Sequence, residues 1–227
     1  MNISKKNSKG AVGKKGSKRA PAKRAEEDVR DYFDNGGYRK RFAGVSVLGY
    51  LWGENNFPVE MMDNHAFCQC PDCVRQYHPE RAADRGEQSD YVFGFVKKVA
   101  DEIAKSHPDK KISALAYMSR EGVPRNVRLP DNVIIHFTFH GNRLPNAALF
   151  ELQQDLIRQW RRTYPNTGFG VWLYHCFPEH AAKARGFRCF PGFFSKILAK
   201  EYRLLKELNV RECVFYDGMR DDFESWL

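Results

Sequence analysis

The sequence predicts an α/β protein built on a parallel β-sheet and preceded by a disordered basic segment. Two observations lead to this prediction. Short apolar stretches rich in β-branched and aromatic residues alternate with longer segments whose apolar residues recur at helical spacing, a pattern typical of parallel strands joined by helices. The excess positive charge is gathered in the first 25 residues, which show no apolar periodicity. The alternation fits both an open sheet and the arc of a barrel.

The amino-terminal segment accounts for the whole charge imbalance of the chain. The formal net charge is +9, and residues 1–25 contain nine of the 37 Lys and Arg residues and no acidic residue. Removing these nine leaves 28 basic residues against 28 acidic residues, so the remainder is formally neutral. A segment of Lys, Gly, Ser and Ala cannot bury enough apolar surface to offset the entropy of ordering. We predict a disordered tail over residues 1–37 and a folded domain over residues 38–227, with no nucleic-acid binding beyond weak tail contacts.

The first predicted elements lead into a long loop. Residues 26–41 are mixed and charged and predict one short helix. Residues 42–52 are almost continuously apolar, as expected for a strand that is covered on both faces. Residues 53–88 are rich in Gly, Asn, Pro and Cys, and they predict a loop whose length is typical of functional or disordered segments.

The alternation of helices and strands is clearest after residue 88. Ser89 and Asp90 can cap a helix that runs to residue 107 and carries apolar residues at positions i, i+3 and i+4. A strand over residues 112–117 comes next, and a Pro-containing connector too short for a full helix follows it. Further strands are predicted at residues 132–139, 169–174 and 212–216, with helices at 146–164 and 193–208.

Several other classes of protein are disfavoured. The segment 49–54, at the end of the first predicted strand, lacks the glycine spacing of a dinucleotide-binding loop. No apolar run is long enough to cross a membrane, and no apolar stretch follows the basic start as in a secretory signal. We therefore expect a cytoplasmic protein without membrane contacts. Three of the six cysteines are clustered and three lie singly, unlike a disulfide scaffold.

Several motifs together resemble one protein family. They are DNHAFCQCPDC at 63–73, SDYVFGFV at 89–96, PDKKISALAY at 108–117, LPDNV at 129–133, VWLY at 171–174, and LKELNV at 205–210 leading into VFY at 214–216. Their order and spacing are similar to the family called domain of unknown function 4838, over roughly residues 44–217. The resemblance implies a glycoside-hydrolase-type (β/α)8 TIM barrel related to α-glucuronidases and hexosaminidases.

The five predicted strands look like the fourth to the eighth of such a barrel. The chain is then an incomplete barrel, and we expect a truncated gene or a fragment, with another chain as one source of the missing half. The resemblance also allows a secreted or periplasmic parent protein.

The resemblance places an active site at the carboxyl ends of the strands. Glycoside hydrolysis usually needs two carboxyl groups, one acting as an acid and the other as a base or nucleophile. The candidates are Asp63, which aligns with an acidic position of the family pattern, together with Glu54 and Asp217. Each of these residues also fits a solvated loop charge or a helix cap.

Aromatic and imidazole side chains near the predicted strand ends suit a sugar ligand. The candidates for substrate binding are Tyr117, His136, Trp172, Tyr174, His175 and Tyr216. Trp172 and Tyr174 share one face of their predicted strand, so both could point into the barrel. Packing in the core between strand and helix is the alternative for both.

The cysteine cluster is the sharpest local motif. Cys68, Cys70 and Cys73 can hold one tetrahedral zinc ion, with His65 or His78 as the fourth ligand, and such a closed site is structural. Reduced loop thiols, or one disulfide with a spare thiol, are the alternatives. Catalysis itself would need no cofactor.

The first functional hypothesis is therefore a glycoside-hydrolase-like domain that acts on an acidic or N-acetylated sugar. A non-catalytic carbohydrate-binding or structural barrel is the second. A zinc-stabilised nucleic-acid-binding protein is the third, and the neutral charge of the folded part counts against it.

Overall fold

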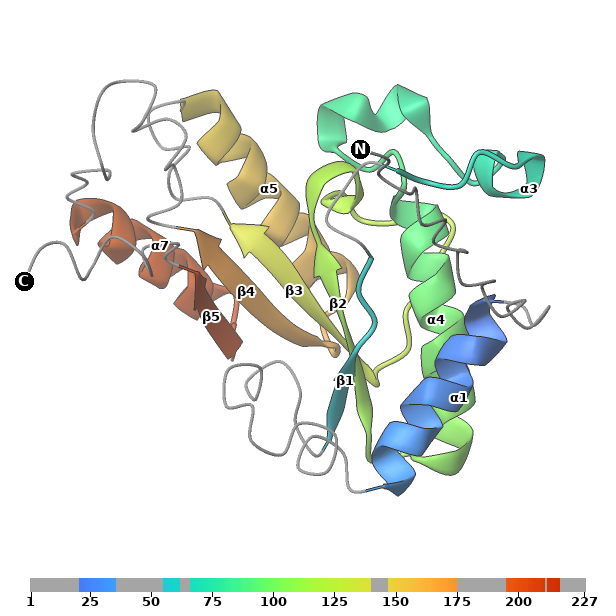
Figure 1. The fold of residues 1–227 in the computed structure, drawn as a ribbon. Coiled ribbons are helices and arrows are strands. Elements are labelled where there is room, and N and C mark those ends of the chain that lie inside the picture. Colours follow the sequence, from blue (N-terminus) through green and yellow to red (C-terminus); the bar gives the residue numbers. More distant parts are fainter. Residues whose placement is uncertain are drawn as a thin grey trace, which may run out of the picture.

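Five parallel strands form one sheet in the computed structural model of the protein (Figure 1). The structure describes residues 21–35, 55–61, 66–139, 147–174, 195–210 and 212–216. The strands are β1 (Asn56–Pro58), β2 (Lys111–Ala116), β3 (Val133–Phe139), β4 (Gly168–Tyr174) and β5 (Glu212–Tyr216).

The strands lie in the sheet in the same order as in the sequence, and each neighbouring pair is parallel. A doubly wound open sheet reverses its strand order at a switch point, whereas a β/α barrel keeps the order of the sequence. The predicted α/β fold with about five parallel strands is confirmed, and the strand order is that of a barrel arc.

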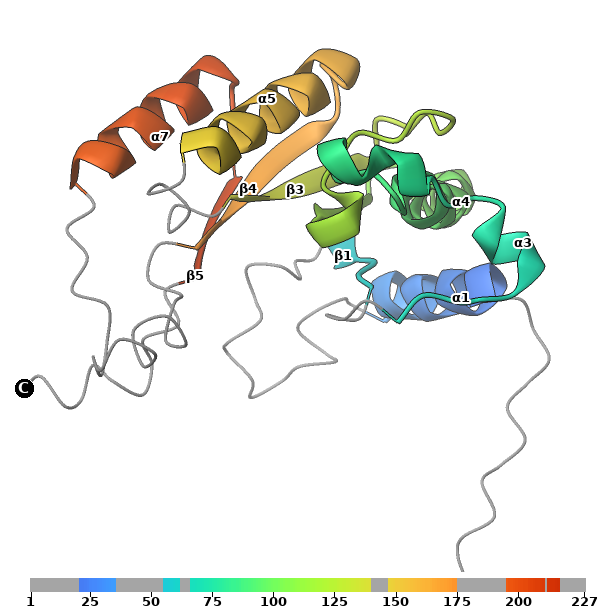
Figure 2. The same cartoon turned by 90° about the horizontal axis from the view of Figure 1, so that it is seen from above.

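Three long helices cover the same face of the sheet. They are α4 (Ser89–Ser106), α5 (Ala147–Thr163) and α7 (Ser195–Glu207), and α5 and α7 lie side by side in both views (Figures 1 and 2). Helix α1 (Pro21–Asp34) packs along α4 (Figure 1). Shorter helical turns are α3 (Pro71–Val74), η1 (Pro79–Asp84) and η2 (Met118–Arg120).

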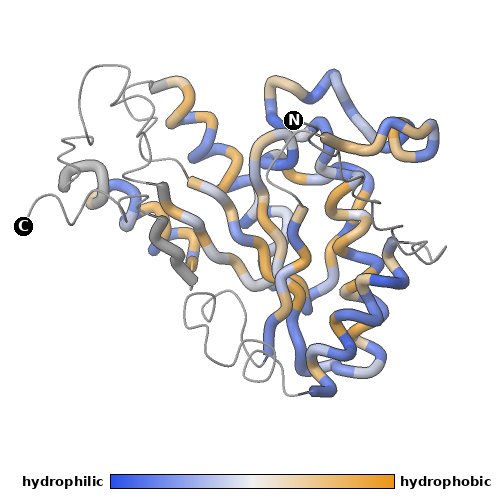
Figure 3. The backbone as a smooth tube through the Cα atoms, in the orientation of Figure 1, coloured by the Kyte–Doolittle hydropathy of each residue, from blue (hydrophilic) through white to orange (hydrophobic). Residues whose placement is uncertain are grey.

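The hydrophobic core lies between the sheet and these helices. Alternate residues of β3, from Val133 through Ile135 and Phe137 to Phe139, belong to this core, because side chains alternate between the two faces of a strand. Phe93 of α4 and Trp160 of α5 meet edge to face at 4.9 Å between ring centroids. The hydrophobic colouring accordingly runs along the strands and in stripes along the helices (Figure 3).

The element boundaries predicted from periodicity agree with the structure from residue 89 onward. Each predicted strand and helix in that range lies within two residues of its observed bounds. The strand predicted at residues 42–52 lies outside the described residues. The prediction of a single loop over residues 53–88 was wrong, because this range contains β1, α3 and η1. A three-residue strand that includes Pro58 has no readable periodicity and depends on its pairing with β2.

A packed helix lies within the range that was predicted to be a disordered tail. Val29, Tyr32 and Phe33 of α1 are buried, and the rings of Tyr32 and Phe33 contact Phe57 of β1 at 5.0 and 6.5 Å between centroids. Residues 21–34 therefore belong to the fold, because an apolar stripe on a charged helix is enough for packing. Residues 1–20 lie outside the described part. Among the described helices, none has the length and apolar character needed to cross a membrane.

Candidate functional site

The carboxyl ends of the parallel strands gather polar side chains from different parts of the chain. Strand β1 ends at Pro58, two residues before Glu60, and β2 ends at Ala116, just before Tyr117 and η2. This edge is where folds of this kind carry their functional groups.

The side chain of Glu60 accepts a hydrogen bond from the backbone of β2. The backbone N–H of Val59 donates to the carbonyl of Ser113 at 2.8 Å. The N–H of Leu115, further along β2, then donates to the Glu60 carboxylate at 3.0 Å. The carboxylate therefore continues the β1–β2 contact at the point where β1 leaves the sheet.

The environment of Glu60 favours its protonated form. Part of the side chain is open to solvent, yet the protein around the carboxyl group displaces enough water to raise its pKa to about 8. The Leu115 N–H and the charge of Arg120 act in the opposite direction and lower the pKa, with smaller effects. Glu60 consequently presents a largely protonated carboxyl group at neutral pH, beside solvent.

Tyr117 and Arg120 follow the end of β2 at the same edge of the sheet. The Arg120 side chain is 2% exposed, and its guanidinium carbon lies 5.6 Å from the centroid of the Tyr117 ring, within the range of a cation–π contact. Met118, between them, has a φ of 54°. Such left-handed backbone is uncommon for a residue other than glycine, and it concentrates at functional sites.

His136 and Trp172 extend from β3 and β4. His136 lies in register with Leu115 on one side and with Gly170 on the other, and Trp172 lies in register with Thr138. His136 is buried in the middle of its strand, so the prediction that it lies at a strand end was wrong. Trp172 is half-buried, and its register partner Thr138 lies two residues beyond His136 toward the carboxyl edge.

Of the residues predicted from sequence, the structure brings Tyr117, His136 and Trp172 to this part of the sheet. Tyr174 and Tyr216 are register partners at the ends of β4 and β5, but their side chains are outside the described part. The predicted residues that lie outside the described part altogether are Glu54, Asp63, His65, His175 and Asp217.

The cysteine cluster forms a separate centre before α4. The sulfur atoms of Cys68, Cys70 and Cys73 all lie within 4.8 Å of one another, and each of the three is a free thiol. The predicted disulfide alternative is therefore not found among these residues. The backbone N–H of Cys73 is the main cause that lowers the pKa of the Cys70 thiol, while the neighbouring Cys70 raises the pKa of Cys73. The cluster has the donors and the spacing of a metal site.

His78 is engaged elsewhere and does not complete this cluster. Its Nε2 lies 2.9 Å from the buried carboxylate of Asp90, and its Nδ1 lies 3.2 Å from Glu80. Tyr91 instead contacts the cluster, with its hydroxyl 3.7 Å from the Cys73 sulfur. The rings of Phe67, Tyr77 and Tyr91 meet edge to face beside the three thiols.

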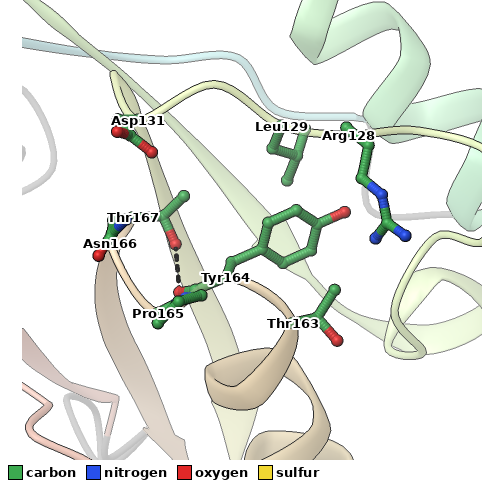
Figure 4. A pocket seen from close by; sticks show the side chains of 8 residues that line it. All are labelled: Arg128, Leu129, Asp131, Thr163, Tyr164, Pro165, Asn166 and Thr167. Carbon is green, nitrogen blue, oxygen red and sulfur yellow. Dashed lines mark hydrogen bonds between the residues drawn. The ribbon is translucent and has the colours of Figure 1, made fainter.

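A small cavity at the opposite edge of the sheet is not part of this site. It has a volume of about 220 Å³ and lies where the chain enters β3 and β4 (Figure 4). Tyr164 spans it, donating its hydroxyl to the Val127 carbonyl at 2.8 Å, while Thr167 Oγ1 donates to the Tyr164 carbonyl at 3.1 Å. The amino ends of the strands in such folds usually serve stability, and we assign this cavity to that role.

Sequence reasoning missed Glu60 and Arg120. The alternation of Asn56, Pro58 and Glu60 places all three on one face once β1 is known, but a loop prediction hides that alternation. Arg120 follows β2 by four residues, and no local sequence pattern distinguishes this buried arginine from those on the surface.

Comparison with known proteins places the chain in one family. No curated protein and no solved structure matches the chain. The model of one family, described as domain of unknown function (DUF4838), matches residues 53–222. This range is well over half of the chain and includes the five strands, Glu60, Arg120 and the cysteine cluster. The chain is thus a member of the DUF4838 family.

Proposed function

We propose that this protein is a carbohydrate-active domain of the glycoside hydrolase type, in which Glu60 is the general acid. The observation that carries the proposal is the Glu60 carboxyl group, whose pKa is raised to about 8 at the carboxyl edge of a parallel sheet. A group that holds its proton at neutral pH and still faces solvent can donate that proton to a leaving group.

Glycosidic bond cleavage assigns Glu60 a definite step. Its Oε–H would protonate the glycosidic oxygen as the bond between that oxygen and the anomeric carbon breaks. The Leu115 N–H at 3.0 Å binds one carboxyl oxygen and so leaves the other for the proton. A second carboxylate must act at the anomeric carbon, either directly or through water, and Asp63, Glu54 and Asp217 are the candidates from the sequence.

The residues around Glu60 suit a sugar that carries an acidic or N-acetyl group. The buried positive charge of Arg120 would favour an anionic group bound nearby. Tyr117 and the half-buried Trp172 offer aromatic faces for the C–H surface of a pyranose ring. Arg120 is buried against the Tyr117 ring, so it would act on a ligand bound at Tyr117 through its charge and not by direct contact.

The experiment that tests this proposal compares Glu60→Gln with the unmodified chain on aryl glycosides of uronic acids and of N-acetylhexosamines. The matched control is Glu151→Gln, an exposed glutamate on the outer helix α5. Glu60→Gln should lower kcat/KM by about 100-fold or more on a substrate with a poor leaving group. The loss should be smaller with a dinitrophenyl leaving group, which departs without protonation. Equal turnover by both variants would refute the role of Glu60, and binding without turnover in the unmodified chain would indicate a non-catalytic sugar-binding domain.

We also propose that Cys68, Cys70 and Cys73 hold a structural zinc ion. Four ligands at 2.3 Å from zinc stand about 3.8 Å apart, so sulfur atoms within 4.8 Å of one another need only small shifts. Helix α3 buries none of its own residues, and a bound metal would replace the apolar core that this segment lacks. His65 is the candidate fourth ligand from the sequence.

A further inference from the structure

The connector that carries Tyr117 and Arg120 is held by the segment that begins α4. The N–H of Gln88 donates to the Ser119 carbonyl at 2.9 Å, and the hydroxyl of Ser89 donates to the Gly122 carbonyl at 2.5 Å. In return, the N–H of Gly122 donates to the Arg85 carbonyl at 2.9 Å. These contacts join residues 117–123 to residues 81–90 as one packed unit.

Glu121 is the buried charge at the centre of this unit. Its side chain is fully buried, and one carboxylate oxygen lies 2.5 Å from a guanidinium nitrogen of Arg85. The other oxygen accepts from the amide of Gln153 at 2.9 Å, while its backbone carbonyl accepts from the Trp160 indole at 2.7 Å. A buried carboxylate is tolerated when it is paired and hydrogen-bonded in this way.

The backbone on both sides of the ion pair is strained. Arg85 and Met118 each have a φ of 54°, a conformation that persists in residues with side chains when the surroundings over-determine it. Glu121 also closes the turn after Met118, since its N–H donates to the Met118 carbonyl at 3.1 Å. The turn therefore depends on contacts made by the residue next to Arg120.

Arg120 connects this unit to the candidate site. It is buried next to the Tyr117 ring, and in the described part of the chain it is the charged side chain that acts on Glu60. A small displacement of the turn would move a guanidinium in surroundings that screen charge poorly.

We propose that the buried Arg85–Glu121 ion pair is a positioning device that fixes the guanidinium of Arg120 near the carboxyl group of Glu60. Glu121 and Arg85 are positioning residues in this account, because they reach the site through the turn and not through a ligand. The proposal rests on Glu60 as the functional carboxyl group, but its test requires no catalytic activity. A failed activity assay and a failed positioning role are therefore distinguishable.

The test is a carbon-13 NMR titration of the Glu60 side-chain carboxyl in the full chain. Glu121→Gln keeps the shape of the side chain but removes the charge that pairs with Arg85. We expect the apparent pKa of Glu60 to rise by about half a unit or more, because a displaced Arg120 stabilises the carboxylate less. Glu201→Gln is the matched control, since Glu201 is equally buried but lies on α7, and it should leave the Glu60 titration unchanged.

A double-mutant cycle with Arg120→Met separates positioning from general loosening. Arg120→Met should raise the apparent pKa of Glu60 by itself, and adding Glu121→Gln should then change it no further. If Glu121→Gln alone leaves the Glu60 titration where it was, or moves it equally without Arg120, the positioning role is wrong. Arg85→Lys, which keeps a charge but loses the planar guanidinium, provides the same test if Glu121→Gln does not fold.

Discussion

The carboxylate of Glu60 accepts the backbone N–H of Leu115 at 3.0 Å, so a side chain takes over a contact of the sheet where β1 ends. This one hydrogen bond holds an ionisable group at the carboxyl edge of the strands, where the charge of Arg120 acts on it. The proposals for the active site all depend on this placement.

The raised pKa of Glu60 predicts a pH dependence of stability. The unfolded chain loses this proton near the ordinary value of 4.5, whereas the folded chain keeps it up to about 8. Between these values the native state binds more protons, so this group makes stability fall as pH rises through that window. Urea unfolding between pH 4.5 and 9 should show a shallower decline for Glu60→Gln than for the unmodified chain. Parallel curves for the two proteins would contradict the raised pKa.

Replacement of Asp90, a buried residue in the first turn of α4, should be strongly destabilising. It is 6% exposed, and its carboxylate accepts the backbone N–H groups of Arg125 and Asn126 at 2.7 and 3.0 Å and pairs with His78 at 2.9 Å. Asp90→Ala should lower the free energy of unfolding by about 3–5 kcal/mol, because it leaves buried partners unpaired. Chemical denaturation provides the measurement. Asp155→Ala, which removes a carboxylate that is 70% exposed, is the control and should change little.

The stability of the fold should depend on the indole nitrogen of Trp160. The residue is fully buried, and Nε1 donates to the Glu121 carbonyl at 2.7 Å. Trp160→Phe removes this donor and part of the packing against Phe93, so we expect a loss of about 2–4 kcal/mol in the free energy of unfolding. Tyr202→Phe, at a position 44% exposed on α7, is a comparison that should be nearly neutral. A neutral Trp160→Phe variant would show that the connector does not depend on this bond.

The cysteine cluster predicts a thiolate metal site that spectroscopy can detect. Addition of Co²⁺ to the reduced full chain should produce sulfur-to-cobalt charge-transfer absorption, and Zn²⁺ should displace the Co²⁺. Cys70→Ser should abolish the absorption, whereas Cys189→Ser, remote from the cluster in sequence, should retain it. Zinc at 100 times its dissociation constant should stabilise the fold by about 2.7 kcal/mol. Loss of zinc to a chelator without any change in Tm would argue against a structural role.

The part of the fold with strong periodicity was predictable from sequence. Helix α4 repeats its apolar residues on one stripe, and strands β2 to β5 are short, apolar and separated by helical segments. Strand β1 was missed, and helix α1 was only partly predicted, as a helix at residues 26–41 that begins five residues too late, for a common reason. Strand β1 is stabilised by β2, and helix α1 is stabilised by α4, which are both distant in the sequence. Residue propensities do not include such tertiary contacts.

The cysteine cluster was easier to predict from sequence than the site around Glu60 and Arg120. The three thiols lie within six residues, so their sequence spacing was enough to predict the cluster that the structure contains. Glu60 and Arg120 are 60 residues apart and meet through the pairing of β1 with β2. Desolvation of a carboxyl group is a property of its tertiary surroundings, and no local motif encodes it.

The measurement that tests the central claim most directly is the carbon-13 titration of Glu60 in the unmodified full chain. We expect a carboxyl group that stays protonated at neutral pH and titrates near a pKa of about 8. A midpoint close to the ordinary value of 4.5 would show an ionised surface carboxylate, and Glu60 could not then serve as the general acid.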